Sequence, residues 1–411
     1  MRIDDALRRI EELRTINAFV YVVGRATRDS LPRSESISLE PVASHGGERR
    51  RDELLGQGLV VAVKDNIDVR GMPTTAGGRH LSPDPRTRDA ECVRRLRATG
   101  CAIVGKTGLY EYAMGGTSRN EHYGDVRNPR DPARDAGGSS SGSAAAVAGG
   151  LCDAAVGTDT LGSVRIPAAF CGVVGYKPPR AAIPRRGVFP NSLSLDSVGV
   201  LASDVATAAR LVDLMRRRPL RAGRPLRPAA LAVPWSWLDG VTDDVRDAFM
   251  AAASGLPNIA LPSRDEFGPA AFGVVQYESY ALHRGWFRSS PDLYGDEVRG
   301  LLEESRGATR SHYDAARREV TRLRRRVRQA LATVDAILLP TVPAVAPRRA
   351  RYPLALRRKL SEWTRPFNVS DSPAFSIPLP GTRLPIGLQI VANDEATAIA
   401  VALRLERRLR T

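Results

Sequence analysis

The chain has 411 residues, of which 43% are hydrophobic and 26% charged; these are the proportions of an ordinary folded domain and exclude a disordered or fibrous chain. No apolar run approaches the ~20 residues that a membrane-spanning helix needs, and the charged stretch 1–14 does not match a secretion signal. We therefore expect a soluble, cytoplasmic protein without a membrane partner.

The formal net charge of +16 would suit a nucleic-acid partner. The arginines, however, concentrate in 216–228, 312–332 and 404–410 without interleaved aromatic residues, which is typical of solvated helix faces and loops. The four cysteines form no C-x-x-C pair, and the five histidines show no metal-ligand spacing. We therefore expect buried free thiols, no metal, no cofactor and no nucleic-acid partner.

The hydrophobic pattern predicts helices and strands that alternate along the chain. In chain order we expect a helix at 4–16, a strand at 58–63, a helix at 91–99, a strand at 101–104, a helix at 142–150, a strand at 152–157, a helix from Ser203, a long helix at 312–332, strands at 335–339, 374–378 and 386–392, and a final helix from 394. Two stretches, 31–56 and 216–230, are expected to be exposed loops. Because the strands are continuously apolar, the sheet should be buried on both faces, which indicates an α/β fold.

Two of these helices have a clear apolar face. The helix from Ser203 should turn inward Val205, Ala208, Ala209, Val212 and Met215, and the long helix should turn inward Val320, Leu323 and Val327.

The segment 100–107, GCAIVGKT, matches the phosphate-binding pattern G-x-x-x-x-G-K-[ST] letter for letter. That pattern binds phosphate only where a strand precedes it and its own residues form a loop. Here a predicted helix precedes Gly100, and the four residues between the two glycines are an apolar predicted strand. We therefore do not expect ATP or GTP hydrolysis at this segment.

Two further glycine-rich segments suit a catalytic site. The segment 137–143, GGSSSGS, has the composition of a flexible linker, but it runs directly into an apolar helix and strand. A glycine-rich turn before a helix presents N–H groups and hydroxyls in an electropositive spot, which favours catalysis over a spacer. The segment 157–163 ends a strand in a polar turn carrying Ser163, whose amides at 160–163 could form an oxyanion hole; a structural turn is the alternative.

Lysine is rare in this chain: only four of the 61 basic residues are lysines. Arginine stays protonated, whereas a buried lysine can become neutral and act as a base. Lys64 follows an apolar strand, where its ammonium group would be costly to bury unless it is neutral or bonded to hydroxyl and carbonyl oxygens. A structural ion pair of Lys64 with Asp65 or Asp68 is the alternative.

Together these segments resemble the amidase signature family. The resemblance rests on AVKDNIDVRG, GKTGLYEYAMGG, GGSSSGSAAAVA and GTDTLGSVRIPAAFCGVVGYKP, in the family's order and spacing, and later on ILLPTVPAVAP, PFNVSDSPAFSIPL and LPIGLQIVA. It covers about residues 4–410 and implies one complete domain, 1–411, with a large mixed central sheet covered by helices on both faces. Within it we expect a signature core at about 58–200 and a substrate-side and C-terminal part at about 200–411.

The resemblance also implies roles for individual residues. Lys64 is expected to be the base, Ser139 the middle serine after a cis Gly138–Ser139 bond, and Ser163 the nucleophile that forms the acyl-enzyme. This agrees with the residues themselves, because a serine hydroxyl needs a nearby base and no histidine occurs in these motifs. The expected oxyanion hole consists of Thr160, Leu161, Gly162 and Ser163. The expected substrate-binding residues are Met114, Gly115, Asp159, Arg165 and Arg284, with an ordinary surface arginine as the alternative for Arg284.

The expected function is hydrolysis of a small-molecule amide, carbamoyl or urea-type C–N bond, with release of ammonia or an amine. Leu161 stands where the family often has glycine; branches resembling allophanate and biuret-type hydrolases also lack that glycine and carry GGSSSGS, which favours a small polar carbamoyl substrate. Two alternatives stay open: an amidotransferase A-type subunit that works with partner subunits, and a non-hydrolytic ligand-binding or biosynthetic protein. A homodimer is compatible with the sequence.

Overall fold

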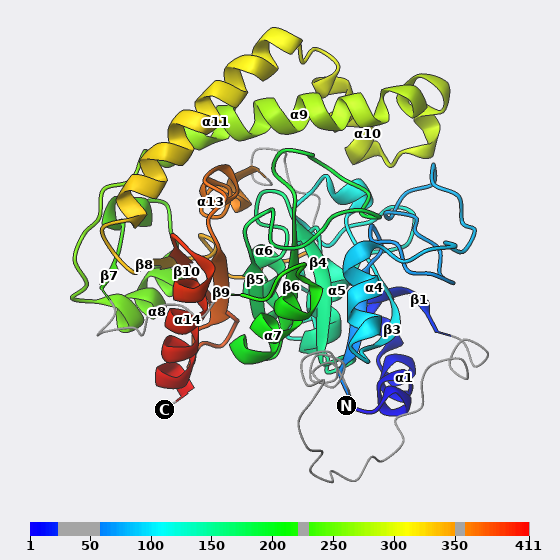
Figure 1. Cartoon of the computed structure of the whole chain (residues 1–411), viewed down its shortest axis with the longest axis horizontal. Helices are drawn as coiled ribbons and strands as arrows, with labels where there is room; N and C mark the ends of the chain where they lie inside the picture. The colour runs from blue at the N-terminus through cyan, green and yellow to red at the C-terminus, as the bar shows by residue number, and fades with distance from the viewer. Residues whose placement is uncertain (24–57, 221–229, 350–357, 411) are drawn as a thin grey trace, which may run out of the picture.

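The computed structural model describes residues 1–23, 58–220, 230–349 and 358–410. In this part of the chain a 10-stranded mixed sheet forms the centre of the molecule (Figure 1). In spatial order its strands are β1 (Phe19–Val22), β3 (Ala102–Thr107), β2 (Val60–Lys64), β4 (Ala154–Asp159), β6 (Ser197–Ala202), β5 (Val174–Lys177), β9 (Ala374–Pro378), β10 (Gly387–Ala392), β8 (Ala336–Pro340) and β7 (Leu231–Ala232).

Helices alternate with these strands along the chain and cover the sheet. In chain order the α-helices are α1 (Ile3–Glu12), α4 (Glu91–Ala98), α5 (Ser141–Ala148), α6 (Arg165–Cys171), α7 (Val205–Met215), α8 (Asp243–Ala253), α9 (Arg264–Ser289), α10 (Asp296–Ser305), α11 (Arg310–Leu331), α13 (Pro366–Val369) and α14 (Glu395–Arg410). Short 3-10 helices lie at Arg14–Ile16, Glu111–Ala113, Trp235–Leu238 and Pro291–Leu293.

The pairing of the strands joins both halves of the chain in one sheet. β5 pairs antiparallel with β6 on one side and with β9, from the second half of the chain, on the other. β2 pairs in parallel with both β3 and β4. Because parallel strands end at the same edge of a sheet, Lys64 at the end of β2 and Asp159 at the end of β4 lie at a common edge.

The central strands contribute to a separate core on each face, because successive side chains of a strand point in opposite directions. Val61 and Val63 belong to the core covered by α4, α7 and α14, whereas Val60 and Ala62 belong to the core covered by α1, α5 and α6. The predicted α/β fold, a mixed sheet covered by helices on both faces, is therefore confirmed.

A third layer, made of α9, α10 and α11, lies across the top of the sheet in Figure 1. α9 packs against both α10 and α11, and α9 and α11 also contact α13. α9 begins with a capping box in which Ser263 and Glu266 bond to each other's backbone N–H groups. α11 buries Val320, Leu323 and Val327, as their spacing predicts.

The predicted elements are present, with shifted ends. The strand expected at 152–157 is β4, which begins and ends two residues later, so the turn after it is shorter than predicted. On α7, Ala209 is only half-buried and Leu211 is buried in its place. Strands β1, β5, β6 and β7 were not predicted, because they are short or interrupted by glycine. The loop expected at 31–56, and most of the one at 216–230, lies outside the described residues.

Candidate active site

Lys64 is completely buried at the end of β2. Its Nζ donates hydrogen bonds to Ser139 Oγ at 2.7 Å and to Thr158 Oγ1 at 2.8 Å, with Thr158 O at 3.5 Å. Burial lowers the pKa of Lys64 to about 7, although the carboxylates of Asp196 and Asp159 raise it. A large fraction of this amine is therefore neutral near neutral pH and able to accept a proton.

The alternative of an ion pair between Lys64 and a neighbouring aspartate is wrong for both candidates. Asp65 pairs with Lys106 at 2.8 Å, and Asp68 pairs with Arg86 at 3.2 Å. Lys106 belongs to the G-x-x-x-x-G-K-T pattern, and that pattern forms strand β3 rather than a loop, as predicted. Because its ammonium is buried against Asp65, Pro73 O and Thr74 Oγ1, Lys106 has a structural role.

Ser139 is also completely buried, and the Gly138–Ser139 peptide bond is cis, as expected. The next residue, Ser140, joins this segment to the end of β4 through hydrogen bonds. Its amide donates to Ser163 O at 3.2 Å, and its hydroxyl donates to Thr158 O at 3.2 Å. The serine-rich segment therefore lies against both the lysine and the turn that carries Ser163.

Ser163 lies at the boundary between this buried network and a cavity. It is 8% exposed and lines the cavity wall. Within the described residues, no hydrogen bond joins the hydroxyls of Ser139 and Ser163. The structure thus brings Lys64 and Ser139 into contact and leaves the last side-chain contact of the expected relay unmade.

The turn after β4 is held by a buried ion pair between Asp159 and Arg165. Arg165 donates two hydrogen bonds to the Asp159 carboxylate, through Nε at 3.0 Å and Nη2 at 2.9 Å. Its other bonds go to Thr364 O, Asn368 Oδ1 and Gln389 Oε1. Burial opposes ionisation of Asp159, yet the adjacent guanidinium holds the pKa of this carboxyl well below its usual value.

This geometry corrects the prediction that Asp159 and Arg165 bind substrate. Both side chains are inaccessible to solvent, neither lines the cavity, and the guanidinium's hydrogen-bonding capacity is used within the protein. Their place is underneath the turn, where they fix its conformation.

Only some of the backbone N–H groups in the predicted oxyanion turn are free to bind an oxyanion. The Gly162 amide donates to Asp159 Oδ1 at 2.8 Å, so this N–H is already committed inside the turn. Among the described residues, the amides of Thr160, Leu161 and Ser163 have no acceptor. Thr160 is oriented by its hydroxyl, which donates to the buried carboxylate of Asp196 at 2.7 Å. Three N–H groups therefore remain that could bind a developing oxyanion.

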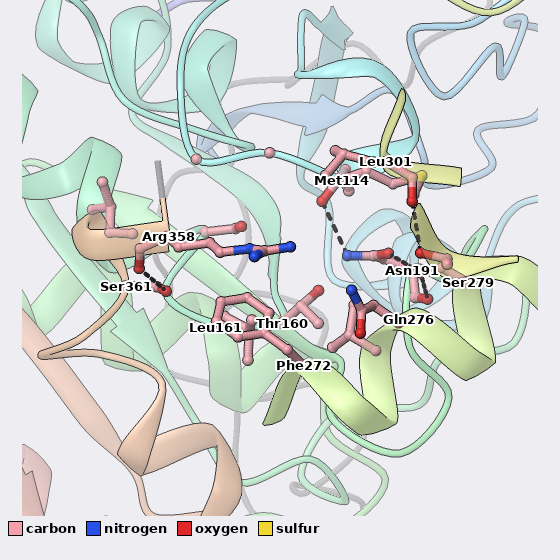
Figure 2. Close-up of a pocket in the computed structure, with 17 residues that line it drawn as sticks. Met114, Thr160, Leu161, Asn191, Phe272, Gln276, Ser279, Leu301, Arg358 and Ser361 are labelled. Carbon is pink, nitrogen blue, oxygen red and sulfur yellow. Dashed lines mark hydrogen bonds between the residues drawn. The ribbon is translucent and has the colours of Figure 1, made fainter. Parts of the chain in front are cut away.

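The cavity beside Ser163 has a volume of ≈ 120 Å³, well below the roughly 300–1,000 Å³ of sites that hold drug-sized ligands. It lies between the turn after β4, the 113–116 segment, α9 and α10 (Figure 2). Its apolar wall consists of Ala113, Met114, Leu161, Ile166, Phe272, Val275 and Leu301. Its polar wall consists of Thr160, Ser163, Asn191, Gln276, Ser279, Ser305, Arg358 and Ser361. A small substrate with an apolar portion fits this composition.

Of the remaining predicted substrate-binding residues, two line the cavity and one does not. Met114 and Gly115 line the cavity beside Ser163. Arg284 lies on the solvent-exposed side of α9 and does not line it, so its prediction as a substrate ligand is wrong. The physical reason is helix periodicity: Phe272, Gln276 and Ser279 form the face of α9 that meets the cavity, and Arg284 lies outside it.

Comparison with known proteins identifies the family. The family model described as Amidase matches residues 6–228 and 269–396. The chain belongs to the amidase signature family. It is thus an amidase-family enzyme, and its single-domain α/β fold is the fold of that family.

The similar proteins include amidotransferase subunits and an amidase. The A subunit of glutamyl-tRNA(Gln) amidotransferase from Koribacter versatilis is 33% identical, over 92% of this chain and 88% of its own. A crystal structure of an amidase is 32% identical, with a TM-score of 0.88 over 99% of this chain and 95% of the other. The same amidotransferase subunit from Thermotoga maritima is 27% identical, with a TM-score of 0.80 over 97% of this chain and 89% of the other.

Several residues around the site of this amidase-family chain were not predicted from the sequence. Thr158 lies within the GTDTLGS motif, and its hydroxyl could have been suspected as an acceptor for Lys64. Thr364, whose hydroxyl donates to Leu161 O at 2.6 Å, and Arg358 lie in the expected substrate-side part of the chain at about 200–411. Asn191 and Gln276 carry no local signal, because only the tertiary fold brings them to the cavity.

Other expectations concern thiols, metals and membranes. Cys92, Cys101, Cys152 and Cys171 are free and buried, as predicted. In the described ranges, no three histidine, cysteine, aspartate or glutamate residues are grouped so that they could hold a metal ion. None of the described helices combines the length and apolar character needed to cross a bilayer.

Proposed function

We propose that this amidase-family enzyme hydrolyses a small-molecule amide through an acyl-enzyme on Ser163, with Ser139 and Lys64 relaying the proton. The observation that carries the proposal is the 2.7 Å hydrogen bond between Lys64 Nζ and Ser139 Oγ in a completely buried setting. Burial is what allows the lysine to act as a base, because it lowers the pKa of Lys64 to about 7.

The proposed reaction moves one proton along this relay. Neutral Lys64 takes the proton of Ser139, and Ser139 takes the proton of Ser163 as the Ser163 oxygen attacks the substrate carbonyl. The relay requires the Ser163 hydroxyl to turn toward Ser139 in the substrate complex. The free amides of the turn after β4 would stabilise the negative oxygen of the tetrahedral intermediate.

Collapse of the intermediate breaks the C–N bond. The Ser139 hydroxyl donates a proton to the leaving nitrogen, the ammonium of Lys64 re-protonates Ser139, and the acyl group stays on Ser163. Water then attacks the ester, its proton returns along the same relay, and the carboxylic acid leaves. Atoms and charges balance over the cycle without a cofactor: one amide and one water give one acid and one amine or ammonia.

A second candidate function is that of the glutamine-cleaving A-type subunit of an amidotransferase. The names of the relatives favour it, since those at 31–35% identity bear that name. The identity to a crystallised amidase, 32%, is in the same range. Both candidates need the same cleavage at Ser163; they differ in the substrate amide and in the fate of the ammonia.

The test is intact-mass analysis after treatment with a small fluorophosphonate, followed by an ammonia-release screen on amides. We expect one adduct in the wild type, none in Ser163→Ala, and a much slower reaction in Lys64→Ala. Ser305→Ala is a matched control, because Ser305 also lines the cavity but its hydroxyl donates to Leu301 O at 2.7 Å. Absence of an adduct on folded wild-type protein, with a known amidase labelled in parallel, would refute the activated serine.

The screen also separates the two candidate functions. Ammonia release from simple amides by the isolated chain supports the stand-alone hydrolase. Release that occurs only with glutamine, and only in the presence of amidotransferase partner proteins, supports the second candidate and contradicts the first.

A further inference from the structure

The described wall of the cavity beside Ser163 carries positive charge and no negative charge. Among its described lining residues, Arg358 is the single charged side chain, and neither aspartate nor glutamate is present. Asp196 lies behind the wall, but its oxygens already accept hydrogen bonds from Thr160 Oγ1 and from the amides of Asn191 and Ser192. The described lining therefore offers no carboxylate to pair with a cationic substrate group.

Arg358 is placed so that it can bind an anion in the cavity. Figure 2 shows its side chain extending from the wall with the guanidinium directed into the cavity. Its backbone is held in place, because its carbonyl oxygen accepts hydrogen bonds from Ser361 Oγ at 3.0 Å and from Arg365 Nη1 at 3.3 Å. The guanidinium carbon lies 5.3 Å from the centre of the Phe272 ring, on the opposite wall formed by α9.

The partner of Arg358 in this structure is exchangeable. One guanidinium nitrogen, Nη2, donates to Glu304 Oε2 at 2.9 Å. Glu304 lies on α10 outside the cavity lining, and the side chains of this pair are 38% and 47% exposed. Ion pairs this exposed contribute little, and a guanidinium has five N–H donors, so a substrate carboxylate can bind Arg358 beside Glu304 or in its place.

The rest of the cavity suits the body of such a substrate. Apolar side chains such as Leu161 and Val275 would contact a short methylene chain, and Gln276 offers a carboxamide that has no hydrogen-bond partner among the described residues. We propose that the enzyme selects small amides whose acyl chain ends in a carboxylate, that Arg358 binds this carboxylate, and that an α-ammonium group is rejected. This inference rests on the proposed function and names its substrate class.

Glutaramate and glutamine test this selection directly, because they differ only in the α-ammonium group of glutamine. Valeramide has a similar chain without the carboxylate. We expect wild-type kcat/KM to be higher for glutaramate than for either compound by about 10- to 100-fold, with succinamate and adipamate showing which chain length spans the cavity. Equal or better turnover of glutamine would overturn the proposal.

The decisive variant is Arg358→Gln. It should lower kcat/KM for glutaramate by about 10- to 100-fold, mainly through KM, and should lower kcat/KM for valeramide far less. Arg284→Gln is the matched control, an exposed arginine on α9 that does not line the cavity, and it should leave all three substrates unaffected. An unchanged preference for glutaramate in Arg358→Gln would contradict the proposal.

A binding measurement keeps this inference separate from the proposed hydrolysis. Calorimetric titration of Ser163→Ala with glutaramate needs no turnover. Binding that is tighter than that of glutamine, and that is lost in Ser163→Ala/Arg358→Gln, supports the carboxylate site even where the wild type fails to release ammonia. Equal binding of the two compounds would refute selection by charge, whatever the result of the activity assay.

Discussion

Lys64 Nζ and Ser139 Oγ lie 2.7 Å apart, and neither residue is accessible to solvent. The contact follows from the order of the strands. β2 ends at Lys64 beside β4, and the segment after the cis Gly138–Ser139 bond is bonded to Thr158 at the end of β4. A base and a hydroxyl thus meet at one edge of the sheet because two parallel strands end there.

The first prediction concerns the pH dependence of activity. The pKa of Lys64 is lowered to about 7, so the lysine is protonated and inactive as a base below that pH. We expect kcat/KM to rise about tenfold per pH unit below pH 7 and to level off above it, with the rate of fluorophosphonate labelling following the same curve. An ascending limb near pH 10.5, the ordinary pKa of a lysine, would show that burial does not lower the pKa of Lys64.

The second prediction concerns Thr158, whose hydroxyl accepts from Lys64 Nζ at 2.8 Å. Thr158→Val keeps the shape but removes this acceptor, so the amine loses one of the groups that orient it. We expect kcat/KM to fall about 10- to 100-fold. The ascending limb should move to lower pH, because the lost hydrogen bond stabilised the charged amine. Thr158→Ser retains the hydroxyl and should retain most activity; equal losses in both variants would indicate a packing defect instead.

The third prediction concerns the stability of the buried Asp159–Arg165 pair. Arg165→Met leaves the Asp159 carboxylate buried without its cation, which should lower the free energy of unfolding by about 3–5 kcal/mol. Because the pKa of Asp159 is held below its ordinary 3.8, the stabilising contribution of this pair is present at neutral pH and is lost only in strong acid. Urea denaturation at pH 7 and in acid measures both effects.

A control for this prediction is the exposed pair of Arg8 with Asp5 on α1. Arg8→Met should leave the urea midpoint unchanged within error, because exposed ion pairs contribute little. A similar change in both variants would mean that burial of the Asp159–Arg165 pair has no special effect.

The sequence predicts those parts of the structure that local pattern determines. The helical period places Val320, Leu323 and Val327 on the buried side of α11. The apolar strand before Lys64 and the small residues of the helix after Ser139 predict a buried position for both residues, and both are buried. The buried face of α11 and the burial of Lys64 and Ser139 all depend on residues that are near one another in the sequence.

What escaped prediction depends on pairing between distant segments. The contact of Lys64 with Thr158 joins residues 94 positions apart and requires β2 and β4 to be parallel neighbours. The family resemblance implied that Arg165 binds substrate, but Asp159 and side chains from the second half of the chain occupy its guanidinium. Strands β5 and β6 lack a clear alternating pattern, because they are buried on both faces and contain glycine.

The fourth prediction concerns Gly162, at the centre of the turn that carries Ser163. Its φ of +129° is a conformation that side-chain-bearing residues rarely adopt, and a Cβ there would lie 2.1 Å from Thr364 Oγ1. We expect Gly162→Ala to lower both kcat/KM and the Ser163 labelling rate by about 100-fold, because the turn must shift and the oxyanion amides move with it. Gly240→Ala is the matched control: its φ is +80°, but nothing lies within 4 Å of the added Cβ.

A second substitution tests whether the contact with Thr364 causes this loss. Thr364→Ala removes the oxygen that would clash, together with its hydrogen bond to Leu161 O, and should by itself cost little activity. In Gly162→Ala/Thr364→Ala we expect partial recovery, because Thr364 Oγ1 is gone, whereas the contacts of the added Cβ with the Cβ of residue 364 at 2.7 Å and with Ile166 Cδ1 at 2.9 Å, and the strain at φ +129°, remain. Losses that simply add in the double mutant would show that the Thr364 hydroxyl is not the cause, and would assign the defect to the remaining close contacts and to the backbone conformation of Gly162.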